Sequence, residues 1–127
     1  INGAAIEHAV LSDGCIINRA QISDSIVGVR SVVGDGTMIQ RVVMMGADYY
    51  ESADSIDRNK TLGRPPFGIG SNTRIQNAII DKNARIGNNC IISPAGKDEN
   101  CDGEGYYVRD GIVIIPKNAI IPDNTVI

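Results

Sequence analysis

The sequence predicts an all-β fold, a left-handed parallel β-helix of hexapeptide repeats with two loop insertions. The main observation is a six-residue template: an aliphatic residue, two variable residues, Asn or Gly, a small residue and a final variable residue. Seven stretches of the 127-residue chain match it, at 11–16, 33–38, 69–74, 80–85, 86–91, 115–120 and 121–126. This period fits neither a 3.6-residue helical repeat nor the alternation of a strand, and it is typical of β-helices built from hexapeptides.

Each position of the template has a physical role in such a coil. The leading aliphatic residue points inward and stacks on its equivalent one coil away, where β-branched Ile and Val pack well. Asn or Gly, three residues later, tolerates the left-handed backbone conformation that a sharp corner needs. The next residue is always Cys, Thr or Ala, since only a small side chain fits inside beside the turn. Three short sides make a coil of about 18 residues, so the regular residues predict roughly four to five coils.

Two stretches break the template. Residues 46–68 are expected to form a projecting loop with one helical turn near 52–60, and the Gly-, Asp- and Glu-rich stretch 93–111 a loop with a short strand at 106–108. We expect 1–127 to be a single β-helix domain cut from a longer protein, because the chain begins in mid-pattern without Met. The unpaired strand edges at the two ends of the coil would then be covered by missing sequence, another subunit or a loop.

Composition and charge exclude several functions. The net charge of −3 gives no general nucleic-acid-binding surface, and no apolar run approaches the ~18 residues of a membrane span. Three cysteines without a C-x-x-C pair indicate neither a disulfide framework nor a zinc cluster, and weakly favour a reducing compartment. Cys15 and Cys90 occupy the small-residue position and are predicted to be core thiols, whereas Cys101 lies in an acidic loop where it can be exposed.

The sequence offers little for catalysis. His8 is the only histidine, and a zinc site needs several His or carboxylate ligands. As the base of a hexapeptide acyltransferase, His8 would have to lie between subunits. Phosphate-binding glycine motifs are lacking, and Asp54 and Asp57 are expected to be solvated in a loop without a basic partner.

Four basic residues are candidates for binding an anion. Lys82 and Lys117 are both the third residue of their template units. If coils stack in phase, both project from the same kind of corner and can converge on one phosphate, which suits the flexible charge of lysine. Arg74 and Arg85 both close a unit and point outward. Periodicity alone favours the simpler interpretation of four solubilising charges on an outer face, and spacing does not establish convergence.

Residues 26–127 resemble the C-terminal β-helix domain of ADP-glucose pyrophosphorylase (glucose-1-phosphate adenylyltransferase) of plants, algae and cyanobacteria. The resemblance lies in motifs that keep the order and spacing of that family, at 26–31, 44–51, 66–70, 79–87, 105–109 and 111–119. The first two lean toward the large, regulatory subunit type. Residues before 26 match only as generic hexapeptides, and the stretch 94–101 departs from the family pattern, which leaves the contacts of that loop open.

This resemblance implies a function for the parent protein, which would join ATP and glucose 1-phosphate, with Mg²⁺, into ADP-glucose and pyrophosphate for starch or glycogen synthesis. The catalytic nucleotidyltransferase domain would lie N-terminal to this chain, so the chain itself is expected to be inactive and to hold no cofactor. The β-helix would contact that domain, build a tetramer and help bind the activator 3-phosphoglycerate and the inhibitor phosphate. Two effector-site lysines of the family fall on Lys82 and Lys117, with Arg74 or Arg85 as further candidates.

The location implied is the plastid stroma in a plant or alga, or the cytoplasm in a cyanobacterium. Two other readings remain open from the residues alone. One is an acyltransferase-like trimer that uses His8, and the other is a purely structural domain that mediates subunit contact.

Overall fold

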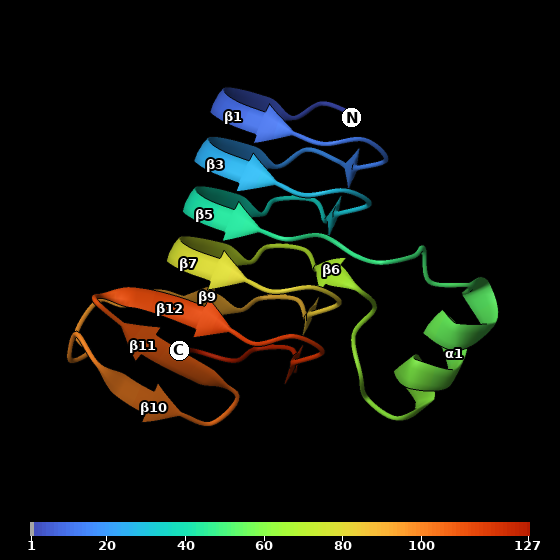
Figure 1. The fold of residues 1–127 in the computed structure, drawn as a ribbon. Coiled ribbons are helices and arrows are strands. Elements are labelled where there is room, and N and C mark those ends of the chain that lie inside the picture. Colours follow the sequence, from blue (N-terminus) through green and yellow to red (C-terminus); the bar gives the residue numbers. More distant parts are fainter. Residues whose placement is uncertain (1) are drawn as a thin grey trace.

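The computed structural model describes residues 2–127 and confirms a parallel β-helix (Figure 1). Its strands form two sheets whose members come from successive coils. The first sheet contains, in spatial order, β1 (Ala5–Leu11), β3 (Gln21–Val27), β5 (Met38–Met44), β7 (Arg74–Ile80), β12 (Ile112–Ile115), β11 (Tyr106–Arg109) and β10 (Cys101–Gly103), with β9 (Ile91–Ile92) also paired to β7. The second contains β13 (Ile120–Ile121), β8 (Arg85–Ile86), β6 (Gly68–Ile69), β4 (Val32–Val33) and β2 (Ile16–Ile17).

The register shows that the coil is slightly shorter than the three full hexapeptides predicted. Ala5 pairs with Gln21 and Arg74 pairs with Ile91, so the chain returns to the same position before three complete template units have passed. Left-handed corner residues explain the difference: in the coil that contains β7 they fall at 72, 77, 83 and 89, so one side is one residue shorter than the other two. The short side runs into the next one through Asn77, and together they form the single strand β7.

The corners follow the template closely. All seven residues at the Asn or Gly position have a positive φ, between 55° and 77°. They are Gly14, Gly36, Asn72, Asn83, Asn89, Asn118 and Asn124. Since this conformation is costly for most L-residues and cheap for Gly and Asn, the template selects the two residue types that turn most easily at these positions. Other corners are made by residues outside the template position, such as Arg19, Asp24 and Arg41.

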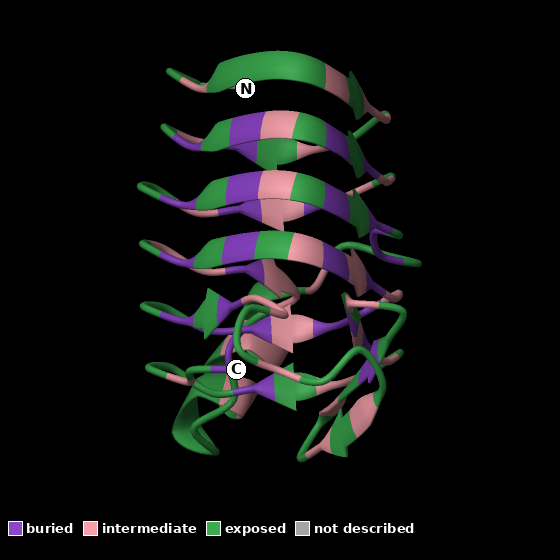
Figure 2. Cartoon of the chain, turned by 90° about the vertical axis from the view of Figure 1, so that its left-hand side faces the viewer, coloured by how far each residue is buried: buried purple, intermediate pink, exposed green. Residues whose placement is uncertain are grey.

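The core is a column of aliphatic side chains along the axis. Six of the seven leading residues of the template are buried, and Leu11 packs partly against the same core. Buried and accessible positions alternate along β3 and β5 except at the left-handed residues Asp24 and Arg41, where two accessible positions follow one another (Figure 2). The prediction of core thiols is confirmed for Cys90, which is buried, while Cys15 is half-buried against the core and Cys101 is half-buried in the second insertion.

Small polar side chains tie successive coils together. The hydroxyl of Thr37 donates to the carbonyl of Gly70 (2.6 Å), and the hydroxyl of Thr73 donates to the carbonyl of Gly87 (2.8 Å). The Cys90 thiol makes the equivalent contact one coil later, with a carbonyl oxygen at 3.2 Å. Each acceptor is the second residue of the equivalent template unit in the next coil, so this ladder of hydrogen bonds runs along the axis through the small-residue position. Buried hydroxyl and thiol groups need hydrogen-bond partners, and the carbonyl groups of this ladder supply them.

The first insertion contains a longer helix than the single turn predicted. Helix α1 (Ala53–Thr61) has nine residues and begins at Ser52, whose hydroxyl accepts a hydrogen bond from the backbone N–H of Ser55. Asp54 and Asp57 therefore lie on a helix and not in a loop, which corrects the sequence-based placement. A capping serine followed by an acidic first turn is favourable at a helix start. No helix among residues 2–127 has the length and apolar character needed to span a membrane.

The second insertion, 93–111, forms an antiparallel hairpin. The predicted strand at 106–108 is confirmed as β11, which pairs with β10 on one side and with β12 on the other. Because β12 is the last parallel strand of the first sheet, the hairpin covers an edge that would otherwise carry unpaired backbone groups. The two insertions leave the stack on different sides (Figure 1).

The ladder of small polar residues can be tested by the substitution Thr73→Val, which keeps the shape and removes the hydroxyl. The free energy of unfolding should fall by about 1–3 kcal/mol, because the Gly87 carbonyl and the Cys90 amide lose a buried partner. Urea unfolding measures it. The control is Thr125→Val, whose half-buried hydroxyl bonds only within its own turn; equal losses in both variants would contradict a role for inter-coil bonding.

Candidate anion-binding site

Lys82 and Lys117 lie in stacked corners of successive coils. The turn between β7 and β8 carries Lys82, and the turn between β12 and β13 carries Lys117. The amide of Asp81 donates to the carbonyl of Ile115 (2.9 Å), and the amide of Asn118 donates to the carbonyl of Lys82 (3.0 Å). These bonds put the two lysines in equivalent positions of adjacent coils, where neighbouring strands are about 4.8 Å apart.

A carboxylate accompanies these lysines. The Oδ1 of Asp48, at the start of the first insertion, lies 3.2 Å from the Nζ of Lys82. Hydrogen bonding from Asn83, then from Lys82, together with the positive charges of Lys82 and Lys117, holds the pKa of Asp48 below its ordinary value. We call Asp48, Lys82 and Lys117 the lysine corner. Lys117 is exposed and has no ion-pair partner within 4.0 Å among residues 2–127.

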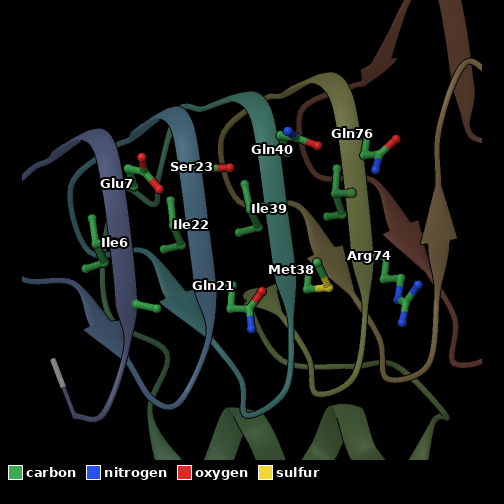
Figure 3. A pocket seen from close by; sticks show the side chains of 12 residues that line it. Ile6, Glu7, Gln21, Ile22, Ser23, Met38, Ile39, Gln40, Arg74 and Gln76 are labelled. Carbon is green, nitrogen blue, oxygen red and sulfur yellow. The ribbon is translucent and has the colours of Figure 1, made fainter.

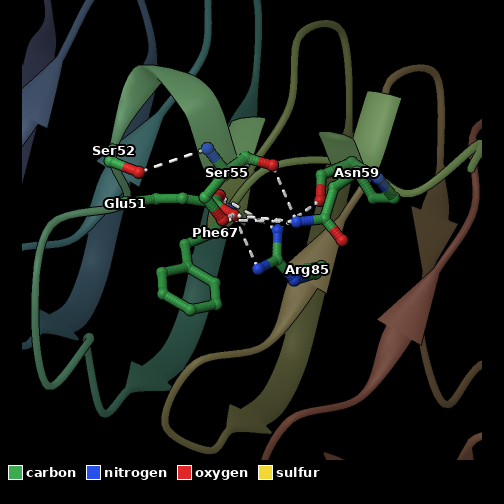
Figure 4. Close-up of polar contacts among 7 residues, drawn as sticks. Glu51, Ser52, Ser55, Asn59, Phe67 and Arg85 are labelled. Carbon is green, nitrogen blue, oxygen red and sulfur yellow. Dashed lines mark hydrogen bonds and ion pairs between the residues drawn. The ribbon is translucent and has the colours of Figure 1, made fainter. Parts of the chain in front are cut away.

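Arg85 is engaged in a different contact. Its guanidinium forms two hydrogen bonds to Glu51, at 2.7 and 2.9 Å, and a third to the carbonyl of Pro65 at 3.0 Å (Figure 4). It also lies 4.2 Å from the centre of the Phe67 ring. The side chains are only 13% and 4% exposed for Arg85 and Glu51. An anion that used Arg85 would therefore have to displace Glu51.

Glu51 joins this ion pair to the whole first insertion. Its carboxylate also accepts hydrogen bonds from the Ser55 hydroxyl, the Asn59 amide and the backbone N–H of Phe67. Burial by itself raises the pKa of Glu51, but the hydrogen bonds from Arg85, Ser55 and Phe67 outweigh it and hold the pKa below its ordinary value. The insertion is thus fixed to β8 by a charged residue of the repeat.

Arg74 lies apart from the lysine corner. It begins β7, whereas Lys82 follows the end of that strand. Its side chain lines a groove of about 460 Å³ on the outer face of β1, β3, β5 and β7, together with Met38 and Gln76 (Figure 3). The structure therefore brings Lys82 and Lys117 together and does not bring Arg74 or the guanidinium of Arg85 to them. Their joint assignment to one effector site remains a prediction.

His8 is exposed and separate from the lysine corner. Its side chain is 83% exposed, and its Nδ1 lies 3.5 Å from an oxygen of Asp24. The sequence did not identify Asp48 or Glu51 as partners of the basic residues. Both lie more than 30 positions from those partners, within an irregular stretch that carries no spacing signal.

The parallel sheets and the left-handed corner residues together define a hexapeptide parallel β-helix domain with two insertions. Residues 1–126 match the family model described as the GLGC left-handed parallel beta-helix domain. The chain belongs to this family, which confirms the predicted handedness and the resemblance to the β-helix domain of ADP-glucose pyrophosphorylase.

A curated relative supports the same assignment. Over 124 residues the chain is 45% identical to glucose-1-phosphate adenylyltransferase large subunit 1, chloroplastic/amyloplastic, of Zea mays. The match covers 96% of this chain and 24% of the relative, so the chain spans about a quarter of that protein's length.

The Glu51–Arg85 pair predicts a pH-dependent stability difference. Glu51→Gln should lower the free energy of unfolding at pH 7 by about 3 kcal/mol, because a buried guanidinium loses its partner. The pKa of Glu51 is lower in the folded than in the unfolded state. Its stabilisation is therefore fully present above the ordinary pKa and is lost as the pH falls through the folded-state pKa.

Urea unfolding of wild type and variant at pH 7 and well below pH 4.5 measures this effect, and the difference should shrink in acid. Glu104→Gln is the control, since Glu104 is an exposed carboxylate of the second insertion with no ion pair among residues 2–127. A difference for Glu51→Gln that is unchanged in acid would rule out the charged pair as its source.

Proposed function

We propose that this chain is a regulatory and assembly domain of a glucose-1-phosphate adenylyltransferase, and that the lysine corner helps to bind its anionic effectors. The observation that carries the proposal is the stacking of Lys82 and Lys117 in adjacent coils within a chain of this family. The effectors are phosphate and 3-phosphoglycerate, as the resemblance implies.

The chemistry of the corner suits a phosphoryl group. Lysine ammonium groups are flexible point charges that follow a phosphate without a fixed geometry. Lys117 is exposed and has no ion-pair partner among the described residues, so it can contact an anion without first losing a contact. Lys82, in contrast, already pairs with Asp48. A hydrogen bond to a charged group contributes about 1.5–3 kcal/mol, so each lysine is able to change effector affinity substantially.

The remaining parts of the proposal concern the parent protein. The catalytic domain, ATP and Mg²⁺ would lie outside this chain, and other subunits would complete a tetramer. The relative from Zea mays is a chloroplastic/amyloplastic large subunit, which supports a plastid location and a large-subunit type. The family match supports the adenylyltransferase domain over the acyltransferase alternative, for which His8 is the one candidate base.

The proposal predicts that Lys117→Ala, in the full-length enzyme with its partner subunits, raises the 3-phosphoglycerate concentration for half-maximal activation about tenfold or more. The reason is the loss of one charged contact of about 1.5–3 kcal/mol. Lys82→Ala should act in the same direction. Activation curves at fixed substrate concentrations measure both.

The matched control is Lys97→Ala, which removes a lysine from the second insertion, outside the corner. Its activation curve should coincide with that of the wild type. If neither corner variant shifts the curve, the site assignment is wrong and the domain has only a structural role.

A further inference from the structure

Asp48 is held in place by Asn83, independently of Lys82. The Nδ2 of Asn83 donates to the Oδ2 of Asp48 (3.1 Å), and the backbone N–H of Asp48 donates to the Oδ1 of Asn83 (3.0 Å). The other carboxylate oxygen, Oδ1, faces the ammonium of Lys82 at 3.2 Å. Two reciprocal bonds therefore orient the carboxylate before the lysine contributes anything.

Asn83, which holds Asp48, is itself fixed by burial and by its backbone contacts. Asn83 is only 8% exposed and occupies a left-handed corner with φ of 60°. Its own N–H donates to the carbonyl of Gly46 (3.1 Å), in the coil before it. Three residues beyond Asp48, Glu51 is locked to Arg85. The segment that carries Asp48 is thus tied down at both ends, and the carboxylate has little freedom to move away from the corner.

We infer that Asp48 is a built-in competitor for the anion at Lys82, and that its fixed negative charge limits the affinity of the lysine corner. The inference rests on the proposed function of Lys82 and Lys117. When an anion approaches, Lys82 has to exchange the carboxylate of Asp48 for it, and the carboxylate remains nearby and repels it. The corner then responds only to effector concentrations that overcome this competition.

The alternative role for Asp48 has the opposite sign. A carboxylate that positioned the Lys82 ammonium for the anion would raise affinity, and its removal would weaken binding. Three observations favour competition. Both side chains remain substantially exposed, at 44% for Lys82 and 41% for Asp48, so an anion can reach the ammonium. The contact uses the carboxylate oxygen that Asn83 leaves free. The charge of Lys117 also acts on Asp48, so this carboxylate partly neutralises both lysines.

Asp81 is the other carboxylate of this corner and has a different role. Its Oδ1 accepts a hydrogen bond from the backbone N–H of Lys82 (2.7 Å), which stabilises the turn itself. It forms no ion pair with the Lys82 ammonium among the contacts of residues 2–127. Asp48 is therefore the carboxylate that competes directly for the lysine.

The test is Asp48→Asn, which removes the charge and keeps an oxygen to accept the bond from Asn83. In the full-length enzyme with its partner subunits, binding of inorganic phosphate is measured directly by equilibrium dialysis. The dissociation constant should fall about three- to tenfold, the effect of removing one unit charge roughly 6 Å from a half-exposed site. The gain should shrink when KCl is raised toward about 0.5 M, where screening shortens to a few ångströms.

The control is Asp57→Asn, an exposed carboxylate on α1 that forms no ion pair among residues 2–127 and lowers the net negative charge equally. It should leave the phosphate dissociation constant unchanged. Lys117→Ala is measured beside it and should weaken phosphate binding.

The outcomes separate the two proposals. Tighter phosphate binding in Asp48→Asn with weaker binding in Lys117→Ala supports both. Weaker or unchanged binding in Asp48→Asn, with Lys117→Ala still weakened, overturns the competitor role and leaves the effector site intact. If Lys82→Ala and Lys117→Ala both bind phosphate as the wild type does, the effector site and the competitor role fail together.

Discussion

The in-register stacking of coils is the constraint on which the rest of the structure depends. Each coil must return the chain to the same position after slightly less than three template units, and this requires three sharp corners per coil. Left-handed Asn and Gly residues make many of these corners at low cost, and Arg, Asp or His residues adopt the same conformation at the others. When the coils stack in register, the aliphatic residues form one buried column, and the small polar residues donate hydrogen bonds to carbonyl groups of the next coil. The regular spacing also places Lys82 and Lys117 side by side.

The first insertion is held by a charge that projects from this regular scaffold. Arg85 occupies the variable last position of its template unit, where the repeat imposes no residue type, and there it binds Glu51 and the loop around Phe67. A nearly buried ion pair is tolerable here because hydrogen bonds satisfy the carboxylate from several directions. The second insertion uses backbone pairing instead, through β11 and β12. Each insertion is therefore attached by the chemistry available at its own site.

The lysine corner brings both features together. Its two lysines belong to template units of the repeat, and its carboxylate, Asp48, lies at the start of the first insertion. In a half-exposed site, single charges change affinity by modest factors, because water screens them. This balance of charges is the basis of the proposed anion-binding role of the corner.

The sequence by itself determined the repeat and its two interruptions, because the template reflects local preferences that recur with every unit and are lost where it breaks. The handedness and the family came from the resemblance of its longer motifs to a known family, which the family model confirms. The sequence also identified Lys82 and Lys117 as equivalent positions. The tertiary structure alone decided the coil length, since Asn77 and its equivalents make one side shorter than the template suggests. It alone decided the partners as well: Glu51 and Asp48 reach Arg85 and Lys82 across a long stretch of intervening chain. Contacts between an irregular loop and a distant coil have no periodic signal, so only the packed fold reveals which charges meet.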